Sequence, residues 1–221
     1  MGAETMSRVN GTGTGGISAL LARQIDVALS NRMPKDSELA KAPLLAVEYA
    51  RAPFVVAVHG DLGITALTTR QLAGLYGEGA QTFPNGQRAR PVLRLSEDTD
   101  TLLLKSFTPE LAQAMDAAGR RRGMLVANTD GETADLLERT PGAFAGSTLA
   151  LIESERRPLV ALEIDGRRPN PQGLADGSYP HFKTQYLIVR PDATEHTRSF
   201  AAYVQSAEGR ALLRASGRLP R

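Results

Sequence analysis

The feature that most constrains the fold is a nearly continuous apolar run, Pro53-Phe54-Val55-Val56-Ala57-Val58-His59. Successive residues of a β-strand point to opposite faces of the sheet, so a run without alternation predicts a strand that is buried on both faces. Such strands are typical of parallel sheets that helices cover on both sides. The run therefore predicts an α/β fold with a parallel sheet.

Strand-like and helix-like segments alternate along most of the chain. Short β-rich runs predict strands at 25–30, 91–95, 124–127, 158–164 and 185–189. Helical spacing, caps and turn residues predict a helical turn at 36–42 and helices at 68–76, 99–107, 109–118 and 131–139. Residues 197–216 predict one amphipathic helix or two, 144–152 fits either type of element, and the Pro- and Gly-rich segment 166–180 predicts a loop.

Length and composition exclude several classes of protein. The 221 residues suffice for one large domain or two lobes of about 100 residues each. Cysteine is absent, which excludes thiolate nucleophiles, thiolate metal sites and disulfides. No run approaches the roughly 18 apolar residues of a membrane span. Residues 1–5 carry neither the basic nor the apolar region of a secretory signal, so we expect that any such signal was removed or was not encoded.

The charge distribution does not predict nucleic-acid binding. The net charge is +2, and the 22 arginines and 4 lysines are scattered along the chain rather than clustered. The single basic run, Arg120-Arg121-Arg122, predicts a solvated loop or helix end, with a phosphate-contacting patch as the alternative.

A glycine and hydroxyl segment, Gly11-Thr12-Gly13-Thr14-Gly15-Gly16, leads into the helical pattern of Ile17–Gln24. The amide N–H groups of such a turn and the positive end of the helix dipole favour an anion. The glycines also match the dinucleotide pattern G-x-G-x-x-G, but the following helix is short and the next strand ends in Ser30-Asn31-Arg32, where an acidic ribose ligand is expected. We therefore favour an anion site, with a nucleotide site and a purely structural turn as alternatives.

A second anion site is predicted where the strand at 91–95 meets the next helix. Arg94 ends the strand, and Thr99 and Thr101 lie at the helix start, so a guanidinium, hydroxyls and amides could clamp an oxyanion together. The alternative is a salt bridge between Arg94 and the nearby acids.

Catalytic and metal sites find little support in the sequence. There is no G-x-S-x-G motif, and His59, His181 and His196 lie apart. Glu97, Asp98 and Asp100 are best explained as helix caps and dipole partners. No calcium-loop or zinc pattern occurs, so we expect no catalytic residue, no metal and no cofactor.

Taken in order, these segments resemble the phosphate-type periplasmic substrate-binding proteins of ABC importers. The resemblance rests on Gly11–Ile17 with Ile25–Arg32, on Thr68–Tyr76, on Arg94–Leu102, and on the later segments 140–146, 179–180, 186–189, 206–209 and 217–220. It implies a two-lobed type II periplasmic-binding-protein fold, with mixed, mostly parallel sheets flanked by helices. Lobe 1 would comprise residues 1–58 and 166–221 and lobe 2 residues 59–165, joined by crossing hinge strands.

The resemblance also implies a function and a set of ligand-binding residues. A small oxyanion, with phosphate favoured, would bind between the lobes and pass to a membrane permease, in the periplasm or outside the cell. The ligand-binding residues would be Thr12, Gly13, Thr14, Gly15, Ser30 and Asn31 in the first lobe, and Arg94, Asp98, Thr99, Asp100 and Thr101 in the second.

Two departures from that family pattern matter. The family places an acid where Asn31 stands, and small or hydroxyl residues where Asp98 to Asp100 stand, so carboxylates that faced the ligand would repel a dianion by roughly 4 kcal/mol each at 4 Å. One glycine turn also stands where the family has two, as if one αβ unit of lobe 1 were absent, and we expect a homodimer or strand exchange at that edge.

Two alternative functions follow from the sequence. The chain could be a degenerate member of the same fold that serves as an interaction or signalling module. It could also be a nucleotide-dependent enzyme that uses the Gly11–Gly16 turn.

Overall fold

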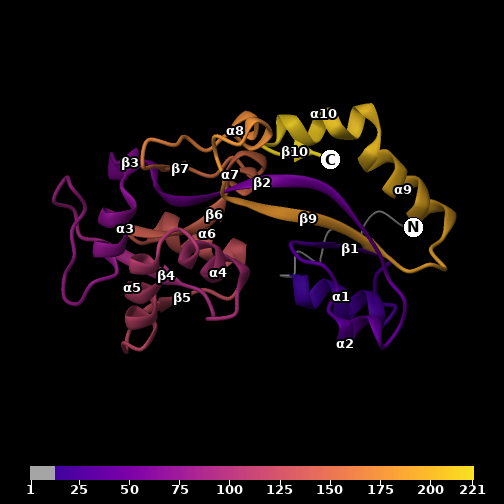
Figure 1. Ribbon diagram of the computed structural model, residues 1–221, viewed down its shortest axis with the longest axis horizontal. Helices are drawn as coiled ribbons and strands as arrows, with labels where there is room; N and C mark the ends of the chain where they lie inside the picture. The colour runs from indigo at the N-terminus through magenta and orange to yellow at the C-terminus, as the bar shows by residue number, and fades with distance from the viewer. Residues whose placement is uncertain (1–12) are drawn as a thin grey trace. The chain divides into compact units, whose positions relative to one another are not determined.

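The computed structural model describes residues 13–221, and the chain divides into two compact units (Figure 1). The first unit contains the residues up to Ala52 together with Lys183–Arg221, and the second contains Pro53–Phe182. Residues 53–58 and 166–182 therefore lie in the second unit and not in the first, where the sequence boundaries placed them. Strand pairing explains this difference, because residues 54–58 pair with residues 144–148 of the second unit. The Tyr179 hydroxyl donates to the Phe54 carbonyl (2.6 Å) and the Phe54 amide donates to the His181 carbonyl (3.0 Å), so residues 179–181 lie in the same unit.

The elements follow one another in the order that the alternating pattern predicts. The first unit contains α1 (Gly13–Leu21), β1 (Val27–Ser30), α2 (Asp36–Leu39), most of β9 (Phe182–Val189), α9 (Glu195–Gln205), α10 (Ala207–Ala215) and β10 (Leu219–Pro220). Strand β2 (Leu45–His59) runs from the first unit into the second. The second unit contains η2 (Gly60–Leu62), β3 (Ala66–Leu67), α3 (Thr69–Leu75), β4 (Arg90–Leu93), α4 (Thr99–Lys105), α5 (Pro109–Gly119), β5 (Leu125–Val126), α6 (Asp130–Arg139), β6 (Ala143–Thr148), α7 (Leu149–Ser154), β7 (Leu159–Ala161), β8 (Glu163–Ile164) and α8 (Pro171–Asp176).

Helices cover both faces of the sheet in the first unit. Ile188 of β9 packs with Ile17 and Leu20 of α1, whereas its neighbour Leu187 packs with side chains of α9 and α10, among them Leu213. Adjacent strand residues point to opposite faces, so these two clusters lie on the two sides of the strand.

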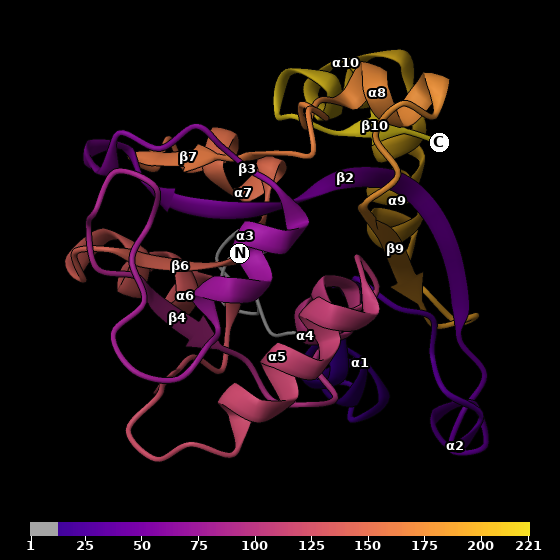
Figure 2. The ribbon, with the colours of Figure 1, turned by 60° about the vertical axis from the view of Figure 1, so that its left-hand side comes forward.

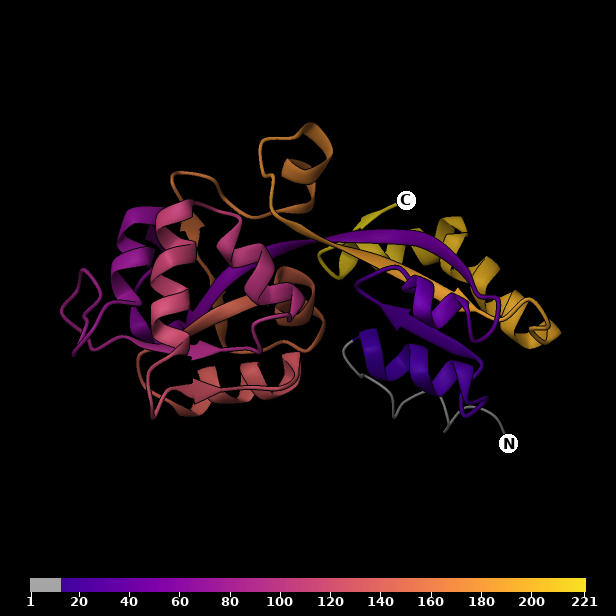
Figure 3. The same ribbon diagram turned by 60° about the horizontal axis from the view of Figure 1, so that its bottom comes forward.

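The sheet of the second unit is also covered on both faces. Phe54, Val56 and Val58 of β2 pack in the core that contains side chains of α3, α4 and α5, and Val55 and Ala57 pack in the core that contains side chains of α6 and α7. Helices α3 and α5 lie side by side (Figure 3), and β4 and β6 are neighbours in the sheet (Figure 2).

The α/β class and the mixed sheet are confirmed, but the predicted parallel pairing of residues 53–59 is wrong. Strand β2 pairs antiparallel with β6, β7 and β10, and β1 pairs antiparallel with β9. Parallel pairing joins β4 to β5 and β6, and β3 to β8. The apolar run of β2 reflects helices on both of its faces, and it carries no information about strand direction.

Capping residues in the sequence predicted where most of the helices begin. Thr68 and Gln71 form a capping box before α3, and Thr148 caps α7, so the ambiguous run 144–152 is a strand followed by a helix. Ser206 separates α9 from α10. The predicted loop 166–180 is wrong in part, because Asn170 caps the short helix α8, which has Pro171 at its first position.

Candidate functional site

Arg94 lies where β4 ends and the chain turns toward α4. The residues before it, Val92 and Leu93, are buried strand residues, and the side chain of Arg94 itself is only 4% exposed. Helix α4 begins at Thr99, directly after its cap Asp98. A guanidinium is thus buried beside a helix start, as the sequence predicts.

Three side chains accept hydrogen bonds from Arg94. Its Nη2 donates to Asp98 Oδ2 at 2.7 Å, and its Nη1 donates to Asp130 Oδ1 at 3.1 Å and to Thr133 Oγ1 at 3.3 Å. The Thr133 hydroxyl donates in turn to the Thr129 carbonyl at 3.0 Å, so the oxygen of this hydroxyl can accept the hydrogen bond from the guanidinium. We call Arg94, Asp98, Asp100, Asp130 and Thr133 the Arg94 cluster.

Asp98 has two roles in this cluster. While its Oδ2 binds Arg94, its Oδ1 accepts the amide N–H of Asp100 at 2.9 Å and so caps α4. These donors, a guanidinium and a helix-start amide, are the kind that would bind an oxyanion. The carboxylate of Asp98 therefore occupies hydrogen-bonding positions that the sequence assigned to a ligand.

The electrostatics of the cluster favour the charged form of Arg94. Burial acts to lower the pKa of the Arg94 guanidinium, but the hydrogen bond to Asp98 and the charges of Asp100 and Asp130 raise it above its usual value. Asp100 is 2% exposed. With one cation and three carboxylates, the cluster has a formal charge of −2, and the salt bridge that the sequence left as an alternative is present.

The remaining predicted residues of this segment also lie at the helix start. Thr99 is the first residue of α4 and is half-buried, and Thr101 is buried in the first turn. The structure thus brings together all five residues that the resemblance placed in the second lobe.

Sequence reasoning missed Asp130 and Thr133. Both lie at the start of α6, just after β5, which is the parallel neighbour of β4. The carboxyl ends of parallel strands meet at one edge of a sheet. The capped helix start after the strand at 124–127 was therefore a signal that could have located them.

The predicted glycine turn differs from expectation. Thr12 lies outside the described residues, and Gly13, Thr14 and Gly15 belong to the first turn of α1 and do not precede it. Their amides are among the helix-start N–H groups that have no intrahelical acceptor.

Ser30 and Asn31 lie at the end of β1 in the first unit. Ser30 is buried, and its hydroxyl donates to the Arg32 carbonyl at 2.8 Å and accepts the Arg32 amide at 3.2 Å. Asn31 is half-buried. The Ser30 hydroxyl is thus used in a local turn, whereas no side-chain hydrogen bond of Asn31 is present among residues 13–221.

Metal binding and membrane insertion find no support in the part of the chain that the structure describes. Residues 13–221 contain no group of three or more His, Cys, Asp or Glu side chains that could hold a metal ion. Among the same residues, no helix is long and apolar enough to cross a membrane.

Comparison with known proteins assigns a family. A family model described as a PBP superfamily domain matches residues 2–208, which is most of the chain. The chain belongs to the PBP superfamily. A curated relative of this PBP-superfamily chain is the phosphate-binding protein PstS of Bacillus subtilis, which is 20% identical over 208 residues that make up 93% of this chain and 67% of the relative.

Solved structures confirm the fold. A Clostridium perfringens protein, assigned to a phosphate ABC transporter as its substrate-binding component and solved with bound phosphate, matches with a TM-score of 0.75 and 16% identity over 95% of this chain and 85% of that one. A high-affinity periplasmic phosphate-binding protein with bound phosphate matches with a TM-score of 0.66 and 13% identity over 95% of this chain and 82% of that one. The chain therefore has the two-lobed type II fold of periplasmic-binding proteins.

Proposed function

We propose that this PBP-superfamily chain is the non-enzymatic solute-binding component of an ABC importer, and that it binds a small oxyanion, with phosphate as the first candidate. The observation that carries the proposal is the buried guanidinium of Arg94 beside the start of α4. The importer, its permease and a periplasmic or extracellular location belong to the proposal, and the names of the relatives support them.

The charge of the Arg94 cluster favours one kind of oxyanion. A fully ionised sulfate would meet the carboxylates of Asp98 and Asp130 with no proton to share. A phosphate that keeps a proton can donate a hydrogen bond to a carboxylate, while its other oxygens accept hydrogen bonds from Arg94 and the α4 amides. We therefore expect phosphate to bind more tightly than sulfate, and its affinity to rise as the pH falls from 8 to 6.

Calorimetric titration tests this proposal. Phosphate, sulfate, molybdate and tungstate are each titrated into the whole chain at pH 6, 7 and 8. Saturable binding of phosphate that exceeds the binding of sulfate supports the proposal. The absence of binding and of a thermal shift with all four anions would exclude it.

A conservative variant connects binding to the cluster. Arg94→Lys keeps the charge but loses the planar fork that can bind two oxygens, so the affinity for phosphate should fall at least tenfold, about 1.4 kcal/mol. Arg122→Lys makes the same change at an exposed arginine outside the cluster and should leave the affinity unchanged. Circular dichroism checks that both variants are folded.

A second candidate function rests on the saturation of Arg94. Because Asp98, Asp130 and Thr133 already accept its hydrogen bonds, the cluster is also the arrangement expected of a ligand-free interaction or signalling module of the same fold. The titration separates the two, since such a module binds none of the four anions.

A further inference from the structure

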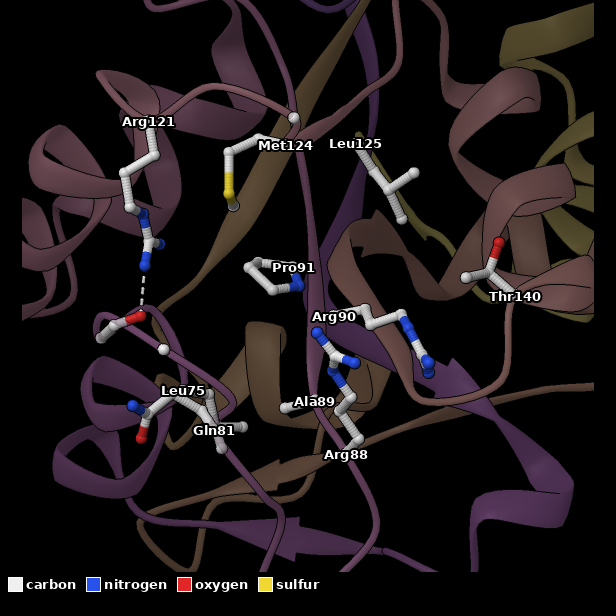
Figure 4. Close-up of a pocket in the computed structure, with 13 residues that line it drawn as sticks. Leu75, Gln81, Arg88, Ala89, Arg90, Pro91, Arg121, Met124, Leu125 and Thr140 are labelled. Carbon is white, nitrogen blue, oxygen red and sulfur yellow. Dashed lines mark hydrogen bonds between the residues drawn. The ribbon is translucent and has the colours of Figure 1, made fainter.

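A pocket lined by three arginines lies at the other end of β4. A pocket of about 360 Å³ opens in the second unit, between the segment that leads into β4, the connection from α5 to β5, and the loop after α3 (Figure 4). This is the amino edge of β4 and β5, whereas Arg94 lies at their carboxyl edge. The length of β4, about 3.3 Å per residue over four residues, separates the two.

The pocket is lined by three arginines and no acidic residue. Arg88, Arg90 and Arg121 all contribute to the wall. Figure 4 shows Arg88 and Arg90 on one side of Pro91 and Arg121 on the other. Within residues 13–221 none of the three forms an ion pair, whereas Arg94, Arg157 and Arg190 each bind at least two carboxylates. The positive charge of this pocket is therefore not neutralised by side chains.

Two of the arginines are held in place by backbone carbonyls. Arg121 Nη2 donates to the Tyr76 carbonyl at 2.7 Å, and its Nη1 donates to the Gly77 carbonyl. Arg90 Nη1 donates to the Pro141 carbonyl. The solvated position predicted for the basic run 120–122 is therefore wrong for Arg121, which is half-buried and donates to the end of α3. These contacts fix the wall of the pocket in advance of any ligand, which lowers the entropic cost of binding.

Arg88 supplies a guanidinium with no partner of its own. Its backbone is fixed, because Thr82 and Arg88 form an isolated β-bridge and the next amide, Ala89 N–H, donates to the Gln81 carbonyl at 2.8 Å. Its side chain is exposed and makes no hydrogen bond within the described part of the chain. The fork of Arg88 can therefore bind two oxygens of an anion without breaking an existing contact.

The rest of the lining is largely apolar. Leu75, Pro91, Met124 and Leu125 contribute hydrocarbon or thioether surface. An inorganic ion would leave this apolar surface in contact with water, whereas an apolar group would cover it and gain hydrophobic stabilisation. The volume lies within the roughly 300–1,000 Å³ of small-molecule sites.

We propose that this pocket binds a small organic anion, in which a carboxylate or phosphate ester contacts Arg88 and Arg90 and a compact apolar body packs on Pro91 and Met124. Both anionic groups match the guanidinium fork, so the shared chemistry defines the ligand. The inference is independent of the oxyanion proposed for the Arg94 cluster, because no residue is common to the two sites.

The experiment follows the methyl group of Met124 by NMR in the whole chain labelled with ¹³C-methyl methionine, with Met124→Leu to assign the signal. The probes are phenyl phosphate and benzoate, with inorganic phosphate and benzyl alcohol as the two halves of the proposed ligand. Phenyl phosphate or benzoate should shift the signal saturably and with at least tenfold higher affinity than either half. The relative affinities of phenyl phosphate and benzoate identify the preferred anionic group.

Matched variants decide whether Arg88 carries the binding. Arg88→Ala should weaken binding at least fivefold, whereas Arg122→Ala, the same loss of charge at an exposed arginine outside the lining, should leave it unchanged. Absence of a saturable shift with both organic anions, an equal affinity for inorganic phosphate or benzyl alcohol, or an equal loss in the two variants would overturn the proposal. Arg94→Lys should leave the Met124 titration unchanged whether or not phosphate binds at Arg94.

Discussion

At the carboxyl end of β4, Arg94 is enclosed by Asp98 and Asp130, with Asp100 nearby, whereas at the amino end Arg88 and Arg90 line a pocket without a carboxylate. The two regions share one four-residue strand. Burial explains the difference. A deeply buried guanidinium requires partners that offset its desolvation, whereas a guanidinium at a pocket wall keeps water until a ligand arrives. Arg94 therefore stabilises the fold even without an anion, whereas the guanidinium of Arg88 has no protein partner within the described residues.

The largest expected effect is the loss of the paired arginine. Arg94→Ala should lower the free energy of unfolding by about 3–5 kcal/mol, because it leaves carboxylates in a largely buried cluster without their cation. Urea denaturation at pH 7 measures the change. Arg157→Ala is the control, and it should cost about 1 kcal/mol because two of its partners, Asp135 and Glu155, are exposed. Equal losses in the two variants would remove the distinction between buried and surface pairing.

Within the pocket, Arg121 should contribute more to stability than its neighbours. Arg121→Ala removes the guanidinium that donates to two backbone carbonyls at the end of α3 and should lower the free energy of unfolding by about 2 kcal/mol. Thermal unfolding followed by circular dichroism checks this value. If Arg121→Ala is as stable as the parent chain, the pocket wall is not fixed as we describe.

A paired arginine in the first unit extends the comparison to pH. Arg32 donates to both carboxylate oxygens of Glu38, at 2.8 and 2.7 Å, and this hydrogen bonding lowers the pKa of Glu38 from 4.5 to about 2. Glu38→Gln should therefore cost about 1.5 kcal/mol at neutral pH. Since the folded-state pKa is the lower one, the stabilisation is complete above pH 4.5 and is lost as the pH falls toward 2.

Urea denaturation of the parent chain and Glu38→Gln between pH 2 and 7 measures this dependence. The stability difference should stay constant from pH 7 to about pH 5 and then shrink. Glu48→Gln, which removes a partly exposed carboxylate that pairs with Arg51 and Arg221, should lower the free energy of unfolding by only about 0.5 kcal/mol. A Glu38 difference that persists unchanged to pH 2 would show that the pair does not hold the pKa down.

The smallest effect is expected for the unpaired arginine. Arg88→Ala should change the free energy of unfolding by less than about 0.5 kcal/mol, because no hydrogen bond or ion pair of this side chain exists within residues 13–221. Differential scanning calorimetry is sensitive enough for this comparison. A loss of 2 kcal/mol or more would place Arg88 among the structural arginines.

The sequence predicted the features of this molecule that depend on local chemistry. The threonine cap Thr68, Asp98 and Pro109 identified helix starts, and the alternating pattern identified the α/β class. The strand end at Arg94 and the acids that follow it indicated both an anion clamp and a salt bridge. The same local argument identified the start of α4 as a candidate anion site.

Features that depend on long-range pairing were not predictable in the same way. The direction of β2 follows from its neighbours β6 and β7, which lie far along the chain, and not from its own apolar residues. Asp130 reaches Arg94 across 36 residues of sequence. The pocket lined by Arg88, Arg90 and Arg121 joins residues 75–91 to 121–140. The sequence could therefore show Arg121 as part of a basic run but not as part of the wall of a pocket.

The most direct test of the proposed function is a crystal structure of the chain grown with phosphate. We expect phosphate within hydrogen-bond distance of the Arg94 guanidinium or the first amides of α4, with a carboxylate of the cluster accepting a hydrogen bond from the protonated phosphate oxygen. Clear density that shows Asp98 still bound to Arg94 and no anion at α4, in a crystal from saturating phosphate, would contradict it.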